Sequence, residues 1–121
     1  MKILICDDDT MTIRALEYQF NREGFEVLKA NSGREAKKIL EENDDINVLI
    51  TDVYMPLMNG LELITYVRNN LQRTIPIVVV SLVNAEANIN EALALEADIY
   101  LTKPFNLNDL SRKVKQLLKE R

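Results

Sequence analysis

The sequence predicts a three-layer α/β fold, written (βα)5, around a five-stranded parallel sheet. Short apolar runs rich in β-branched residues alternate along the chain with longer segments of helical periodicity. Such strict alternation favours a parallel sheet with helices on both faces and right-handed crossovers. The 121 residues contain no internal repeat and no linker, so we expect one domain spanning residues 1–121.

The strands are predicted from apolar runs that end at turn residues. We expect them at residues 2–6, 25–29, 48–52, 77–81 and 99–102. The run at 48–52, which ends at Asp52, is apolar enough to be buried on both faces, whereas the run at 25–29 alternates and suits a sheet edge.

The helices are predicted from their caps and apolar stripes. We expect them at residues 10–23, from a capping box at 32–35 to residue 42, at 61–69, at 86–95, and over a last stretch with inner positions between 107 and 118. Thr10 is the expected N-cap of the first helix, and Asn106 or Asn108 that of the last.

Composition excludes several classes of function. The net charge of −4 argues against a general nucleic-acid binder or a protein of anionic membranes. No apolar span is long enough for a membrane helix. Cys6 is the only cysteine and lies in an apolar strand, so a small buried hydrophobe and a cytoplasmic location are expected. The absence of histidine excludes acid–base and metal chemistry based on imidazole.

Three carboxylates are expected at one edge of the sheet. In the flavodoxin-like strand order 2-1-3-4-5, a crevice opens at the carboxyl ends of strands one and three, and ligands bind there. Asp7, Asp8 and Asp52 follow those strands. Their mutual repulsion would be relieved by a hard divalent cation, and Mg²⁺ accepts few carboxylates while leaving room for a phosphate oxygen.

The ends of strands four and five supply a hydroxyl and an ammonium group, Ser81 and Lys103. Together with the acids and a metal, these groups suit phosphoryl transfer onto Asp52, because an aspartate can act as a covalent acceptor. The chain contains no histidine to relay the phosphoryl group, so the donor must be external.

The chain resembles the receiver domain of two-component response regulators, the group that includes the chemotaxis response regulator. The resemblance covers essentially all of residues 1–121. Its marks are Ile-Leu-Ile-Cys-Asp-Asp-Asp at 3–9, Asp52 followed by Met-Pro and Asn-Gly, Ser81 after three valines, and Tyr-Leu-Thr-Lys-Pro-Phe at 100–105. Each mark alone is weak, but their order and spacing together are highly specific.

The resemblance implies a signalling switch rather than an enzyme, although the domain assists its own Mg²⁺-dependent phosphorylation and dephosphorylation. It implies that Asp52 accepts phosphate from a histidine kinase or a histidine phosphotransfer protein. Asp8, Asp52 and the backbone carbonyl of Tyr54 would bind Mg²⁺ directly, and Asp7 would act mostly through water.

The resemblance also implies roles at the other strand ends. Ser81 and Lys103 would bind the phosphoryl oxygens, and the Lys103–Pro104 bond would be cis. Ser81 and Tyr100 would couple phosphorylation to the surface of helix four, strand five and helix five. That surface would control a downstream protein or effector domain, and phosphorylation-dependent homodimerisation is left open.

Other interpretations remain open at this stage. Asp9 is better explained by the positive end of the first helix than by metal binding. A metal-dependent phosphatase would instead use Asp7 or Asp9 as its nucleophile. A pure binding module, either a nucleotide binder or a receiver that is no longer phosphorylated, would bind without chemistry at Asp52.

Four positions depart from the family's usual pattern. Leu82 replaces a small residue and is expected to narrow access to Asp52, and Glu96 replaces a glycine, so a left-handed backbone there would be strained. Tyr54 and Val83, two residues beyond Asp52 and Ser81, are not short polar side chains that position water. We therefore expect slow self-dephosphorylation.

Overall fold

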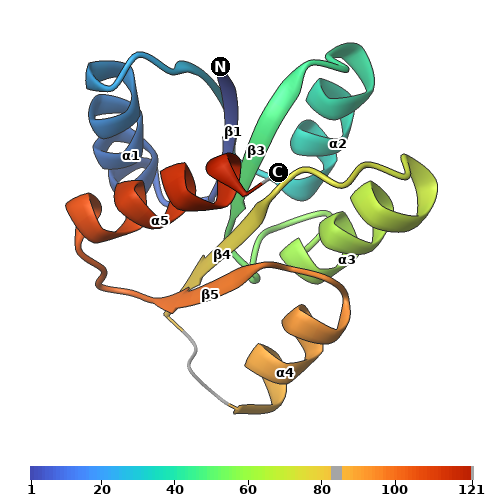
Figure 1. Cartoon of the computed structure of the whole chain (residues 1–121). Coiled ribbons are helices and arrows are strands. Elements are labelled where there is room, and N and C mark those ends of the chain that lie inside the picture. The colour runs from blue at the N-terminus through green and yellow to red at the C-terminus, as the bar shows by residue number, and fades with distance from the viewer. Residues whose placement is uncertain (83–85, 121) are drawn as a thin grey trace.

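The computed structural model describes residues 1–82 and 86–120. Eleven elements follow one another along these residues (Figure 1): β1 (Lys2–Cys6), α1 (Thr10–Arg22), β2 (Glu26–Ala30), α2 (Gly33–Glu42), β3 (Ile46–Thr51), α3 (Gly60–Thr65), the π-helical turn η1 (Tyr66–Asn70), β4 (Ile77–Ser81), α4 (Glu86–Ala94), β5 (Ile99–Thr102) and α5 (Leu107–Lys119). No helix in the described part of the chain is both long and apolar enough to cross a membrane.

The five strands form one parallel sheet in the order β2-β1-β3-β4-β5, so the predicted fold class is confirmed. Helices cover both faces, with α1 and α5 on one side and α2, α3 and α4 on the other (Figure 1). β2 is an edge strand, as its alternating sequence predicted. Because β1 and β3 are neighbours, their carboxyl ends lie side by side.

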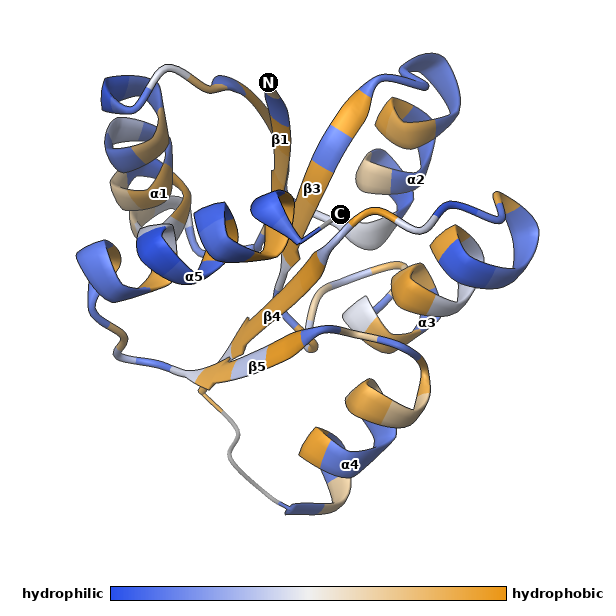
Figure 2. Ribbon diagram, in the orientation of Figure 1, coloured by the Kyte–Doolittle hydropathy of each residue, from blue (hydrophilic) through white to orange (hydrophobic). Residues whose placement is uncertain are grey.

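Alternation of side chains along the strands divides the core into two layers. On β1, Ile3 and Ile5 pack toward α1 and α5, whereas Leu4 and Cys6 pack toward α2, α3 and α4. The strands are correspondingly apolar along their length (Figure 2). Cys6 is fully buried, and burial raises the pKa of its thiol to about 12, so it is the inert core residue that was expected.

Two predicted boundaries near the first helix are wrong by one residue. The N-cap of α1 is Asp9 rather than Thr10, because the Asp9 carboxylate accepts a hydrogen bond from the Met11 amide. The second strand occupies 26–30 rather than 25–29. Phe25 belongs to the turn that follows α1, because its amide donates to the Phe20 carbonyl.

The predicted capping box at 32–35 is half formed. Ser32 accepts a hydrogen bond from the Glu35 amide, as expected for an N-cap. The Glu35 side chain, however, accepts from the Asn31 amide rather than from that of Ser32. The second half of the motif therefore closes one residue earlier, and α2 still begins where the sequence indicated.

The predicted helix at 61–69 is present, but its second half is π-helical rather than α-helical. α3 ends at Thr65 and continues as the π-helical turn η1. Arg68 lies in this turn, and its guanidinium donates to the carbonyls of Arg73, Ile75 and Glu96, which ties the turn to the chain that enters β4.

Glu96, whose carbonyl accepts hydrogen bonds from Arg68, lies just after α4 and has a φ of 75°. Residue 96 therefore has the left-handed backbone that was considered from the sequence, although it is a glutamate and not a glycine. Arg68 also pairs with the Asp98 carboxylate at 3.2 Å, and Asp98 in turn accepts from the Ile77 amide. These contacts fasten the amino-terminal ends of β4 and β5, at the edge opposite the predicted site.

Candidate functional site

The predicted site residues converge at the carboxyl edge of the sheet. Asp7 directly follows β1 and Asp52 directly follows β3. The Asp52 amide donates to the Cys6 carbonyl, and the Asp7 amide to the Ala30 carbonyl, so ladder hydrogen bonds fix both backbones. One carboxylate oxygen from each of Asp7, Asp8 and Asp52 lies within 4.8 Å of the others. The predicted acidic cluster therefore exists, with Asp7 and Asp52 buried and Asp8 exposed.

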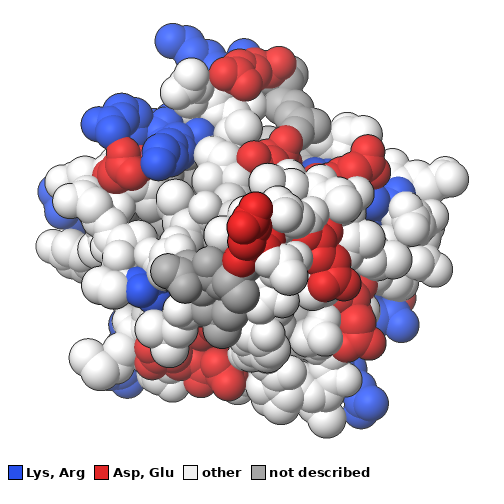
Figure 3. All heavy atoms as spheres, turned by 90° about the horizontal axis from the view of Figure 1, so that it is seen from below, with Lys and Arg blue, Asp and Glu red and all other residues white. Residues whose placement is uncertain are grey.

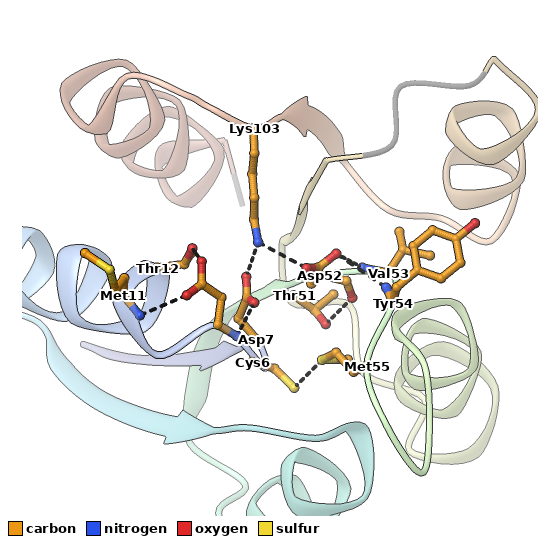
Figure 4. A network of polar contacts seen from close by, with 11 residues as sticks. Cys6, Asp7, Met11, Thr12, Thr51, Asp52, Val53, Tyr54, Met55 and Lys103 are labelled. Carbon is orange, nitrogen blue, oxygen red and sulfur yellow. Dashed lines mark hydrogen bonds and ion pairs between the residues drawn. The ribbon is translucent and has the colours of Figure 1, made fainter.

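Lys103 reaches into this cluster from the end of β5 (Figure 4). Its Nζ lies 2.7 Å from Asp7 Oδ2 and 3.1 Å from Asp52 Oδ2, and its side chain is only 10% exposed. Burial lowers the pKa of Lys103, but hydrogen bonds to the two carboxylates outweigh it and leave this pKa above its ordinary value. The ammonium is therefore held charged between two strand ends.

The pKa of Asp7 is raised, chiefly by burial and against the opposing effect of the Lys103 hydrogen bond. One ammonium among three carboxylates leaves two negative charges if all four groups are ionised. A divalent cation matches that surplus, and carboxylate oxygens are ligands that Mg²⁺ prefers. The donor set therefore fits the predicted metal.

The Asp52 carboxylate is oriented by its surroundings. Its Oδ1 accepts the Val53 amide at 2.6 Å and lies 3.4 Å from the Tyr54 amide nitrogen, while its Oδ2 faces Lys103. The Thr51 hydroxyl donates to the Asp52 carbonyl. These contacts fix the orientation of the carboxylate, and a fixed orientation is what an acceptor of a phosphoryl group needs.

Asp9 serves the first helix. One of its oxygens accepts from the Met11 amide and the other from the Thr12 hydroxyl. Hydrogen bonds from Thr12 and Met11 lower the pKa of Asp9. Both oxygens are therefore committed to α1, as the preferred interpretation of Asp9 predicted, which makes it a poor nucleophile for the phosphatase alternative.

The loop between β3 and α3 is held by two glycines, and sequence reasoning missed the first of them. A Cβ on Gly33 would lie 1.9 Å from the Met58 carbonyl oxygen, and one on Gly60 would lie 1.9 Å from the Asp52 carbonyl oxygen. The Gly60 amide also donates to the Val53 carbonyl. The glycine inside the Ser-Gly-Arg-Glu motif was the available signal, because glycine is needed where two backbones approach closely.

Ser81 and Tyr100 lie on the same face of the sheet. Ser81 is buried at the end of β4, and its carbonyl accepts the Lys103 amide at 2.7 Å. Tyr100 is partly buried on β5, beside Val79, and packs on the core layer below α2, α3 and α4. The Lys103–Pro104 peptide bond is cis, as the resemblance implied.

Leu82 does not lie buried over the site, since it is 75% exposed. It lines a groove of about 420 Å³ whose other residues come from Asp9 and α1 and from the segment between β5 and the start of α5, which includes Lys103. Its predicted effect on access to Asp52 remains a prediction. Val83, the position paired with Tyr54 in the prediction of slow dephosphorylation, lies outside the described residues.

Figure 3 looks onto this edge of the molecule. Acidic side chains lie in several places around its centre, whereas basic side chains stand mostly toward its rim. Negative charge on this face must therefore be offset locally before an anion binds there, and Lys103 contacts the Asp7 and Asp52 carboxylates.

An open parallel sheet with the strand order β2-β1-β3-β4-β5 and helices on both faces defines a flavodoxin-like α/β protein. The family model of the response regulator receiver domain matches residues 3–115, so this chain belongs to that family. It is a receiver domain of the two-component type, similar to the chemotaxis response regulators, and it acts as a phosphorylation-dependent signalling switch rather than a classical enzyme.

Curated relatives of nearly equal length include chemotaxis proteins. The chain is 38% identical to chemotaxis protein CheY1 of Helicobacter pylori over 120 residues, which cover 98% of this chain and 97% of the relative. A CheY homolog of Campylobacter jejuni is also 38% identical, with 98% and 92% coverage. A transcriptional regulatory protein, PhoP of Bacillus subtilis, is 34% identical over 48% of its length.

Solved structures share the fold closely. A two-component response regulator from Clostridium difficile is 30% identical, with a TM-score of 0.92 over 98% of this chain and 96% of that one. A CheY-like receiver domain protein from Methanospirillum hungatei is 32% identical, with a TM-score of 0.90 over 98% and 94% of the two chains.

Proposed function

We propose that Asp52 is the phosphoacceptor of this receiver and that Mg²⁺ is its cofactor. The observation that carries the proposal is the meeting of three carboxylates and one lysine at the ends of β1, β3 and β5. Asp8, Asp52 and the Tyr54 carbonyl would hold the ion directly, and Asp7 mostly through water. When bound, Mg²⁺ neutralises charge on the oxygens of the transferring group.

The donor is a phosphohistidine on a histidine kinase or a histidine phosphotransfer protein. In the transfer, the phosphorus–nitrogen bond breaks and a bond from phosphorus to an Asp52 carboxylate oxygen forms. The imidazole leaves with the electron pair and takes up a proton. The Val53 amide and Lys103 hold the Asp52 carboxylate in position for attack, which is the main contribution this chain makes.

Ser81 and Lys103 then bind the new phosphoryl oxygens. Both side chains come from neighbouring strand ends, and the backbones of the two residues are joined by a hydrogen bond. Tyr100 lies on the same face as Ser81, so a shift of the Ser81 hydroxyl toward the phosphoryl group changes the space beside β5. The surface of α4, β5 and α5 thereby reports phosphorylation to a downstream protein or effector domain.

The remaining assignments rest on family membership. Residues 1–121 act as one receiver domain, in the cytoplasm, through protein contacts rather than direct contact with nucleic acid or membrane. Phosphorylation-dependent homodimerisation through the α4–β5–α5 surface is a further outcome that the same switch could drive.

Self-dephosphorylation, which the domain assists, is slow in this proposal. Tyr54 is 55% exposed beside Asp52 and has no short polar group to hold an attacking water. Tyr54→Asn combined with Val83→Glu should shorten the phosphoprotein lifetime about tenfold or more, because each introduces a group that positions water. The decay is measured by the loss of the phosphoryl mass over time, and unchanged decay would count against the proposal.

The direct test of the acceptor is intact mass after incubation with acetyl phosphate. The wild type should gain one phosphoryl group with Mg²⁺ and none with a chelator, and Asp52→Asn should gain none. An adduct that persists in Asp52→Asn would place the nucleophile elsewhere and favour Asp7. No adduct in the wild type, even with a cognate kinase, would leave a receiver that binds without phosphorylation.

A further inference from the structure

Tyr54 contacts two residues that are far apart in the sequence, Asp52 and Asn88. Its backbone amide faces Asp52 Oδ1 at 3.4 Å. Its side chain points away from Asp52, toward the side of the sheet that carries α4 (Figure 4). There the Tyr54 hydroxyl accepts a hydrogen bond of 3.1 Å from Asn88 Nδ2, in the first turn of α4. One residue therefore touches both the carboxylate and a helix of the predicted output surface.

The two ends of this contact differ in how firmly they are held. The loop that carries Tyr54 is fixed at its base by the close approaches at Gly33 and Gly60 and by the Gly60 to Val53 hydrogen bond. α4 is weakly anchored, since Ala92 is the one buried residue of that helix. A helix with few buried side chains moves at low cost, so a single added contact can bias its position.

We propose that the Tyr54–Asn88 hydrogen bond is a latch that couples the arrangement of α4 to the phosphoacceptor, with Tyr54 as the positioning residue. The inference rests on the proposed function. The latch accompanies the arrangement in which Lys103 pairs with the Asp52 carboxylate, so it stabilises that arrangement over the phosphorylated one. By thermodynamic linkage, whatever moves Asn88 changes how readily Asp52 takes up a phosphoryl group.

The test uses beryllofluoride with Mg²⁺ as a phosphoryl mimic, titrated calorimetrically into the full chain. Tyr54→Phe keeps the ring and removes the hydroxyl, and Asn88→Ala removes the donor. Each should tighten beryllofluoride binding by about two- to tenfold, the range expected from the net strength of one hydrogen bond. The double variant should match either single variant, because both remove the same contact.

Two controls separate coupling from general loosening. Tyr18→Phe removes a hydroxyl that is similarly exposed on α1 and should leave the affinity unchanged. Asn88→Asp should behave like the wild type, because its carboxylate can accept a hydrogen bond from the Tyr54 hydroxyl. Hydrogen exchange of the α4 amides, measured without Mg²⁺ or beryllofluoride, should be faster in Tyr54→Phe and Asn88→Ala than in the wild type.

The outcomes distinguish this inference from the proposed function. Normal binding with unchanged affinities, or with effects that simply add in the double variant, would overturn the latch and leave Asp52 as the acceptor. A wild type that binds no beryllofluoride would overturn the proposed function and the coupling together. Unchanged exchange in α4 would show that the hydrogen bond does not hold the helix.

Discussion

At the residue scale, Lys103 offsets part of the negative charge of the site. Its ammonium contacts Asp7 and Asp52, while Asp8 stands at the exposed side of the cluster. Removing one partner of a buried charge group costs more than the net value of the pair, because the remaining charges stay desolvated. Lys103 therefore contributes to stability as well as to binding of the phosphoryl group.

Lys103→Met should destabilise the protein by about 2–4 kcal/mol in a chelating buffer. Mg²⁺ should then raise the Tm of the variant by more than that of the wild type, because the ion relieves a repulsion that no lysine offsets. Thermal unfolding with and without Mg²⁺ measures both effects.

Lys113→Met, which removes only a surface pair with Asp109, is the control and should cost less than about 1 kcal/mol. An equal gain from Mg²⁺ in Lys103→Met and wild type would contradict this account of the charge balance.

At the scale of elements, loops and helices are held by contacts that set the site's shape. The close packing of α2 on the loop after β3 depends on Gly33, and that loop carries the Tyr54 carbonyl. Glu23, which follows α1, links that helix to α5, because its carboxylate accepts hydrogen bonds from Gln19 of α1 and from Ser111 and Lys115 of α5. We therefore predict separate effects for substitutions at Gly33 and at Glu23.

Gly33→Ala should destabilise the protein by about 1–3 kcal/mol, because its methyl group would overlap the Met58 carbonyl and force the loop to shift. It should also weaken Mg²⁺ binding, which calorimetric titration would measure. Gly24→Asn is the matched control: Gly24 has a φ of 89° with no atom near its Cβ position, and asparagine tolerates that backbone. Equal stability of Gly33→Ala and wild type would show that the loop is not held there.

Glu23 gives the α1–α5 contact a dependence on pH. Burial raises the pKa of Glu23, but hydrogen bonds from Lys115, Ser111 and Gln19 outweigh it, so this pKa lies below its ordinary value of 4.5. A pKa lowered by folding gives stability that is present above about pH 4.5 and is lost as the pH falls through the folded-state value.

Glu23→Gln should therefore cost about 1 kcal/mol at neutral pH and show a flatter loss of stability in acid than the wild type. Urea unfolding at a series of pH values measures both. Glu26→Gln, at an exposed position of β2, serves as the control and should follow the wild-type curve. If the free energy of unfolding fell equally with decreasing pH in Glu23→Gln and in the wild type, the role given to Glu23 would be refuted.

At the scale of the whole molecule, the sheet order and the meeting of the strand ends followed from the sequence. Alternation of short apolar runs with helical stripes predicted the topology, and the topology predicted that Asp7, Asp8 and Asp52 would meet. The π-helical turn was not predictable in this way, because Arg68 contacts carbonyls far along the chain. The Tyr54–Asn88 contact likewise depends on where α4 lies, which local periodicity does not set.

The central claim concerns the whole molecule: a phosphoryl group at Asp52 changes the surface formed by α4, β5 and α5. The most direct measurement is a comparison of backbone amide chemical shifts with and without Mg²⁺ and beryllofluoride. The account predicts changes at Asp52 and Ser81 that continue to Tyr100 and into α4. Changes confined to the immediate neighbours of Asp52, with Tyr100 and α4 unaffected, would contradict it.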